Sequence, residues 1–182
     1  MKNTLEQFDQ AVQRCRNIFL QKTSDYGTAW SVLRPISIVD QLFIKAQRIR
    51  TIQLKRDQRV KDDITGEFIG MVNYSVIGLI QLECGIEERE HDPRQVTEWY
   101  DRHIASARET MENKNHDYGE AWRDMSQESF TDLILMKLLR MKQIISNDGK
   151  TLISEGIDAN YTDIINYALF ALILIEEGKH SG

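Results

Sequence analysis

The sequence predicts an all-α protein, an internally duplicated helical bundle with about three helices in each repeat. Three observations lead to this fold class. The segment KTSDYGTAW (Lys22–Trp30) recurs as KNHDYGEAW (Lys114–Trp122) after 92 residues. The 182 residues include only two prolines and ten glycines, so few positions interrupt helices. Apolar side chains recur at the spacing that lines one face of a helix.

The internal repeat covers most of the chain. One inserted residue changes its spacing from 92 to 93 in the later part of each repeat. We therefore divide the chain into a first repeat, residues 1–90, and a second repeat, residues 91–182, packed as one globular unit. The identical pairs include Asp9/Asp101, Arg16/Arg108, Asp40/Asp132, Lys45/Lys137, Arg48/Arg140, Asn73/Asn166, Tyr74/Tyr167 and Glu83/Glu176.

Each repeat predicts three helices in the same order. The outer two are amphipathic, and polar residues in cap spacing mark their starts. The third is apolar on nearly every side, which is typical of the centre of a bundle, so we expect the two third helices to meet across a pseudo-twofold axis. The sequence leaves open whether this bundle closes within one chain or in a homodimer. The expected helices are Thr4–Gln21, Ser37–Lys55 and Gly66–Glu83, then Thr97–Asn113, a helix beginning at Ser129, and Asn160–Glu177.

Composition excludes several classes of protein. The chain has 23 basic and 28 acidic residues, a net charge of −5, which argues against a nucleic-acid binder that depends on a basic surface. Cys15 and Cys84 have no metal or disulfide spacing. The start lacks the apolar core of a signal peptide, and the longest apolar stretch, Tyr167–Ile175, is too short to cross a membrane. We expect a soluble cytoplasmic protein.

Asn73 and Asn166 are the polar residues that both repeats keep inside an apolar helix. An amide buried without a partner costs about 2 kcal/mol or more, so each must be hydrogen-bonded. One interpretation is an inter-helix hydrogen bond that fixes register. The other is that the amide faces a ligand or a metal-bound water.

Acidic residues gather around the second of these asparagines. Asp163 lies three residues before Asn166 on the same helix face, and Glu155 and Asp158 precede it. Carboxylate and amide oxygens suit Mg²⁺, which leaves waters for a phosphate. Helix capping by Asn160 with Asp163 is the alternative. The first repeat has glycine, Gly70, at the position of Asp163, so the second repeat is the better candidate for a metal.

Glu109 and Glu112 offer a second half for such a metal site. They are three residues apart near the end of a predicted helix, where the first repeat has Asn17 and Leu20. A solvated helix face is the alternative interpretation.

Lys45 and Arg48 lie three apart on one edge of an otherwise apolar helix. Such a pair suits triphosphate oxygens, and it equally suits salt bridges to Asp40 or Glu83. The glycine of each DYG sequence is expected to end a helix in a left-handed conformation. Packing then competes with base stacking as the role of the neighbouring aromatic residues. The second repeat carries the same cations and aromatics: Lys137, Arg140, Tyr118 and Trp122.

The combined pattern K-x-x-DYG, D-x-x-x-x-K-x-x-R and D-x-x-NYA resembles the nucleotide modification associated domain, here in two copies between Phe8 and Gly178. That domain is similar to the MazG-like all-α nucleotide pyrophosphohydrolases. Those enzymes hold Mg²⁺ between acidic pairs on neighbouring helices and cleave nucleoside triphosphates to the monophosphate and pyrophosphate. This chain departs from their pattern because it lacks the doubled acid of EExxE and has asparagine at the final acid.

The resemblance implies a MazG-like fold, a nucleotide or other phosphorylated substrate, and Mg²⁺ or Mn²⁺ as cofactor. The implied activity is a Mg²⁺-dependent pyrophosphohydrolase or a nucleotide-binding relative, and a non-catalytic helical scaffold is the alternative. Glu112 and Asp163 would be catalytic, with Glu112 as base. The implied metal ligands are Glu109, Glu112, Glu155, Asp158 and Asp163. The implied substrate-binding residues are Lys45, Arg48, Asn73, Lys114, Tyr118, Trp122, Lys137, Arg140 and Asn166.

Overall fold

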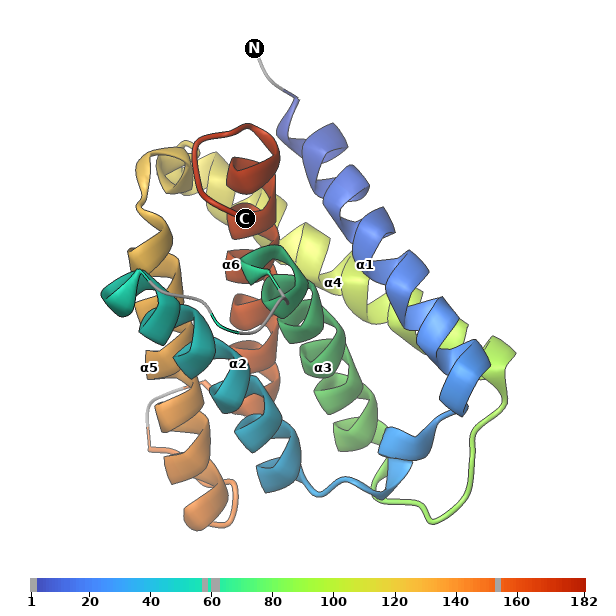
Figure 1. The fold of residues 1–182 in the computed structure, drawn as a ribbon. Coiled ribbons are helices and arrows are strands. Elements are labelled where there is room, and N and C mark those ends of the chain that lie inside the picture. The colour runs from blue at the N-terminus through green and yellow to red at the C-terminus, as the bar shows by residue number, and fades with distance from the viewer. Residues whose placement is uncertain (1–2, 57–58, 60–62, 153–154) are drawn as a thin grey trace.

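The computed structural model describes residues 3–56, 59, 63–152 and 155–182. Within these ranges the chain forms six α-helices and two short 3₁₀ helices, with no strand, so the all-α prediction is confirmed (Figure 1). No helix in the same ranges is both long enough and apolar enough to span a lipid bilayer. The elements are α1 (Thr4–Tyr26), η1 (Ala29–Val32), α2 (Pro35–Lys55), α3 (Ile64–Cys84), α4 (Pro93–Tyr118), η2 (Ala121–Asp124), α5 (Gln127–Ser146) and α6 (Ile157–Glu176).

The third helix of each repeat lies in the centre, as the sequence predicts. The pair α3 and α6 makes the most extensive contact in the molecule. The pair α1 and α4 packs on one side of it, and the pair α2 and α5 packs on the other (Figure 1). The single chain therefore buries both central helices without a second copy.

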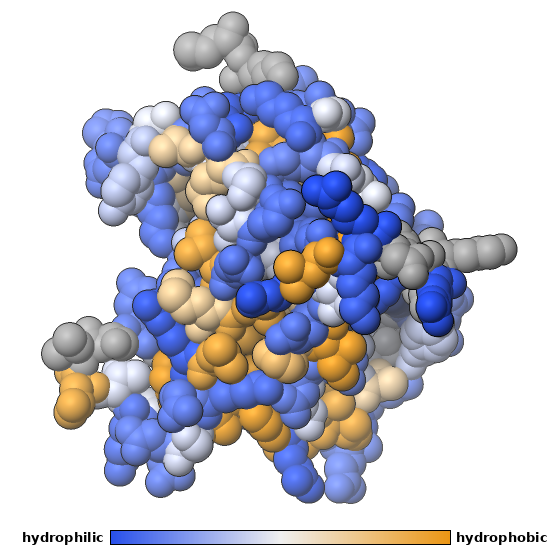
Figure 2. Space-filling model, turned by 60° about the vertical axis from the view of Figure 1, so that its left-hand side comes forward, coloured by the Kyte–Doolittle hydropathy of each residue, from blue (hydrophilic) through white to orange (hydrophobic). Residues whose placement is uncertain are grey.

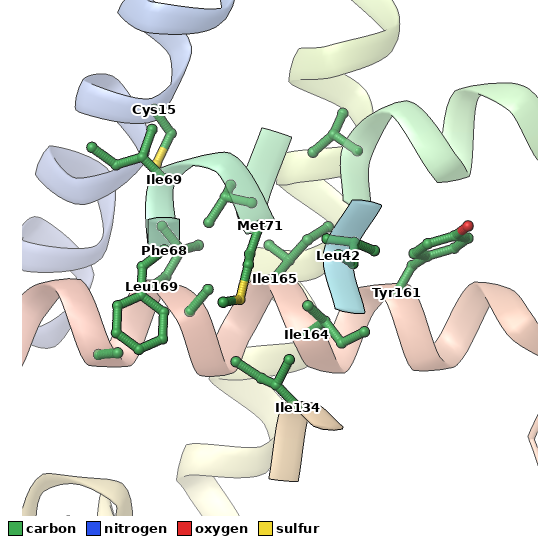
Figure 3. Close-up of a cluster of buried hydrophobic side chains, with 14 of the residues drawn as sticks. Cys15, Leu42, Phe68, Ile69, Met71, Ile134, Tyr161, Ile164, Ile165 and Leu169 are labelled. Carbon is green, nitrogen blue, oxygen red and sulfur yellow. The ribbon is translucent and has the colours of Figure 1, made fainter. Parts of the chain in front are cut away.

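Side chains from all six α-helices meet in one apolar core, part of which is drawn in Figure 3. The central helices contribute the largest share of it because nearly every side of them is apolar. The labelled core residues are Cys15 from α1, Leu42 from α2, Phe68, Ile69 and Met71 from α3, Ile134 from α5, and Tyr161, Ile164, Ile165 and Leu169 from α6.

Reciprocal ion pairs demonstrate the pseudo-twofold relation between the repeats. Arg16 Nε of α1 lies 2.7 Å from Asp101 Oδ1 of α4. Arg108 Nε of α4 lies 2.8 Å from Asp9 Oδ1 of α1. Each pair maps onto the other under the sequence repeat, which is the signature of a self-complementary interface.

The same reciprocity joins α2 and α5. Lys142 Nζ lies 3.2 Å from Asp40 Oδ1, and Arg50 Nη1 lies 3.6 Å from Asp132 Oδ1. The starts that the cap spacing predicts for these two helices are displaced. Helix α2 begins at Pro35, ahead of the expected Ser37, and Ser126 caps α5 instead of Ser129.

The ends of the first helices follow the sequence more closely. Asn3 caps α1 by accepting a hydrogen bond from the Glu6 amide, so the cap lies one residue before the expected Thr4. Both DYG sequences end their helices at the predicted glycine, and both glycines have positive φ. Gly119 has the expected left-handed conformation, with φ 60° and ψ 43°, whereas Gly27 departs from it because its ψ is −140°.

The outer surface of α2 and α5 is not uniformly polar. Figure 2, which brings the left-hand side of Figure 1 forward, shows apolar areas scattered among hydrophilic ones. Exposed apolar side chains on these two helices are Ile36, Ile44, Leu54, Met136 and Leu139.

A close contact between α3 and α6 depends on Gly78. A Cβ atom at this position would lie 2.3 Å from Cζ of Tyr161, so the tyrosine ring packs directly on the α3 backbone. The second repeat has Ala171 at the equivalent position. Helix α3 therefore has no room for a methyl group at Gly78, whereas α6 carries the methyl group of Ala171 at the equivalent position.

We predict that Gly78→Ala lowers the free energy of unfolding by about 2 kcal/mol through overpacking. This loss occurs although alanine is the better helix former by about 1 kcal/mol. Urea denaturation measures it. In a Tyr161→Ala background the same substitution should be neutral or stabilising, and an equal loss in both backgrounds would contradict the packing argument.

Candidate functional site

The first repeat contains a cavity of about 530 Å³ between α1, η1, α2 and α3. This volume lies within the range of small-ligand pockets. The DYG-x-x-W motif ends α1 and forms η1, so the fold places this motif on one wall, opposite the α3 residues of the N-Y motif. The polar and aromatic lining residues are Phe19, Lys22, Thr23, Tyr26, Trp30, Lys45, Asn73 and Tyr74, and Gly66 and Gly70 lie on the α3 side.

Hydrogen bonds from α3 hold η1 at the mouth of this cavity. Gln81 Nε2 donates to the carbonyl oxygens of Ser31, at 2.8 Å, and Leu33, at 3.1 Å. From the other side, the His91 ring lies 5.8 Å from the Trp30 ring, between centroids. These contacts on both sides hold Trp30 in place. No sequence motif pointed to Gln81, because its counterpart in the second repeat is Leu174.

Lys45 and Arg48 converge on Glu67, a buried residue of α3. Arg48 Nη1 lies 2.9 Å from Glu67 Oε1, and Lys45 Nζ lies 3.4 Å from Oε2. The salt-bridge interpretation is correct in kind, but the partner is neither Asp40 nor Glu83. Lys22 has no carboxylate partner among the residues that the structure describes.

The second repeat has a different arrangement at the equivalent positions. Lys114 Nζ lies 2.7 Å from Asp163 Oδ1, and Lys137 Nζ lies 2.7 Å from Oδ2. The Asp163 side chain is only 9% exposed. Its burial alone would raise the pKa of the carboxyl, but the hydrogen bonds from both lysines outweigh this and bring the pKa below its ordinary value.

In the second repeat, an aromatic pair lies at the positions equivalent to two lining residues of the first-repeat cavity. The rings of Trp122 and Phe170 are stacked, with centroids 4.2 Å apart and planes within 4°. Arg123 lies over the Trp122 ring as well, 4.4 Å from its centroid. Phe170 corresponds to Ile77, which lines the first-repeat cavity. Packing is therefore the role of Trp122.

The tyrosines of the two DYG sequences do not pack in the core. Tyr26 is 66% exposed and Tyr118 is 73% exposed. Of the two roles that the sequence left open, packing in the core is therefore excluded for both tyrosines, each of which is the last residue of its helix. Tyr26 lies at the edge of the first-repeat cavity.

The amides that both repeats share make the inter-helix hydrogen bonds that their burial predicts. Asn73 Nδ2 donates to the Cys15 carbonyl and Asn166 Nδ2 to the Ala107 carbonyl, each over 3.1 Å. The Tyr100 hydroxyl, from the other repeat, also donates to Asn73 Oδ1 over 2.8 Å. The repeat places Phe8 at the position of Tyr100, so the second amide has no matching hydroxyl.

The structure does not gather the acids that the resemblance implies as metal ligands. Glu109 is exposed on α4, and Glu112 pairs with Arg108 on the same helix. Glu155 and Asp158 are exposed, whereas Asp163 is held by two lysines. Within the described part of the chain, no three His, Cys, Asp or Glu side chains are placed to hold one metal ion.

Arg140 is exposed on α5. It lines an open groove on the second repeat, together with Lys137 and Asn160.

Comparison with protein families supplies the observation that decides the family. The model of nucleotide modification associated domain 1 matches residues 22–82 and 114–175. The chain belongs to this family. The two matches coincide with the two repeats, so the protein carries the nucleotide modification associated domain in tandem. Searches of curated proteins and of solved structures gave no significant match.

The sequence did not predict the cavity, nor the pairing of Glu67 with Lys45 and Arg48. Two pairs of equivalent repeat positions carried a signal for the cavity. Gly70 corresponds to Asp163, and Ile77 corresponds to Phe170. At both positions the first domain copy has the smaller side chain. Glu67 had no such signal, because its counterpart in the second copy is Asn160.

We predict that Asp163→Asn lowers the free energy of unfolding by about 2 kcal/mol at pH 7, because two lysines lose their anionic partner. The folded pKa of Asp163 lies below its ordinary value of 3.8, so this contribution is present above about pH 4 and disappears as the pH falls through the folded pKa.

Urea denaturation of wild type and variant at pH 7 and pH 3 measures this change. Glu109→Gln removes an exposed carboxylate of α4 and serves as control, with an expected effect below about 0.5 kcal/mol. A gap between wild type and Asp163→Asn that is as wide at pH 3 as at pH 7 would contradict the ion-pair assignment.

Proposed function

We propose that the protein binds a nucleotide in the cavity of its first domain copy. One observation carries the proposal: the residues of the repeated motifs line an open cavity that offers both aromatic faces and ammonium groups. Membership of the nucleotide modification associated family supports a nucleotide as the ligand.

The lining residues match the chemical parts of a nucleotide. Trp30 and Tyr74 present aromatic side chains, and stacking of a base on such a ring is worth about 1–3 kcal/mol. Lys22 and Lys45 supply ammonium groups, which bind phosphate oxygens as point charges. These local cations serve an anionic ligand even though the chain has a net charge of −5.

The predicted magnesium ion does not fit the acids that the resemblance implies. Asp163 already has an ammonium group on each oxygen, and Glu112 has Arg108. We therefore derive no hydrolytic step through a metal. Pyrophosphohydrolase activity stays a prediction, which pyrophosphate release from nucleoside triphosphates with Mg²⁺ or Mn²⁺ tests directly.

We expect Trp30→Leu to weaken nucleotide binding about tenfold or more, because a base loses its stacking surface. Isothermal titration calorimetry with ribo- and deoxyribonucleotides measures this loss. Trp30 fluorescence should also change when the wild type is titrated.

The equivalent tyrosines provide a matched control. Tyr26→Leu, at the edge of the cavity, should weaken binding, while Tyr118→Leu should leave it unchanged, although both side chains are largely exposed. Equal effects of the two substitutions would argue against a site in the first copy. No binding of any nucleotide would favour the helical scaffold.

A further inference from the structure

We infer that Gly70 marks the phosphate subsite of the first-copy cavity, and that the second copy binds no ligand because its own Asp163 occupies the equivalent place. The identity of the anion as a nucleotide phosphate rests on the proposed function. The position of the anion rests on the comparison of the two copies within this chain.

In the second copy, the two equivalent lysines bind a carboxylate. Lys114 comes from α4 and Lys137 from α5, and each binds a different oxygen of Asp163 over 2.7 Å. The carboxylate thus acts as a built-in anion between two cations. Charge-assisted hydrogen bonds of this kind are the ones that also hold phosphate oxygens.

The register of the central helices shows which position of the first copy is equivalent to Asp163. The Asn73 and Asn166 amides donate to equivalent carbonyls, those of Cys15 and Ala107, over the same distance of 3.1 Å. Helix α3 therefore lies against α1 as α6 lies against α4. Since Gly70 and Asp163 each come three residues before these asparagines, they occupy equivalent places.

The space beside Gly70 lacks the anion that the second copy has. A Cβ atom on Gly70 would lie 3.0 Å from Lys45 Cε and 3.1 Å from Lys45 Nζ, so the end of the Lys45 side chain lies against the Gly70 backbone where the second copy has a carboxylate. Lys22, the equivalent of Lys114, lines the same cavity. Glu67 reaches Lys45 and Arg48 from one helical turn earlier, and among the described residues its ion pairs are with these two cations and not with Lys22. A phosphate over Gly70 would take the role that Asp163 performs in the other copy.

The aromatic residues point to the same difference between the copies. Phe170 covers one face of Trp122, whereas Trp30 lines an open cavity that the smaller Ile77 helps to form. In the second copy, Asp163 thus occupies the anion position and Phe170 covers the stacking surface. We therefore expect one bound nucleotide per chain.

The decisive variant is Gly70→Asp, which gives the first copy the carboxylate of the second. Carbon-13 NMR of the new carboxyl should show a pKa below its ordinary value, because Lys22 and Lys45 bind it. Calorimetry should show nucleotide and inorganic triphosphate binding weakened at least tenfold. Ser106→Asp adds the same charge at an exposed position of α4 and should leave binding unchanged.

A second variant keeps the test independent of any strain at Gly70. Lys22 is exposed, so Lys22→Met should fold normally. It should weaken the binding of a nucleoside triphosphate several-fold and leave the affinity for the parent nucleoside unchanged. Equal losses for both ligands would overturn the phosphate subsite.

The results separate this inference from the proposed function. An ordinary pKa for the Gly70→Asp carboxyl, wild-type affinity in that variant, or two ligands per chain overturns the inference. Binding of inorganic triphosphate that Gly70→Asp abolishes, with nucleotides bound no more tightly, upholds the subsite and overturns the nucleotide. A wild type that binds neither nucleotide nor inorganic triphosphate overturns both.

Discussion

The packing of α3 against α6 is the contact on which the rest of the molecule depends. These helices are apolar on nearly every side, so neither can be solvated alone, and each completes the core of the other repeat. The Tyr161 ring seated on Gly78 sets how closely they approach. Once they are paired, the outer helices follow in symmetric positions, and the reciprocal ion pairs of α1 with α4 and of α2 with α5 are consequences of that symmetry.

Duplication gives the two copies the same scaffold and allows their sites to differ. The backbone positions are equivalent, so a single side chain decides what lies between two lysines. In the second copy that side chain is Asp163, and the charges are satisfied internally. In the first copy it is Gly70, and the Lys45 side chain lies against its backbone at the wall of the cavity. The proposed nucleotide site therefore belongs to the first copy, while the second copy satisfies its charges internally.

Much of this fold could be predicted because it follows from local patterns. Apolar periodicity located all six helices, and the buried asparagines required the inter-helix bonds that they make. Helix starts were less predictable, since Asn3 and Ser126 cap helices expected to begin elsewhere. The site was harder still. The Glu67 ion pairs arise only when α2 packs on α3, and a cavity depends on volumes that spacing does not report.

Two-dimensional NMR of the tryptophan indoles during a nucleotide titration tests the central claim most directly, because Trp30 lines the first-copy cavity and Trp122 is stacked on Phe170. The account predicts that the Trp30 indole and the Gly70 amide shift together and saturate at one equivalent, while Trp122 stays unchanged beneath Phe170. Shifts centred on Trp122, or on Lys137 and Arg140 of α5, with Trp30 unmoved, would contradict it.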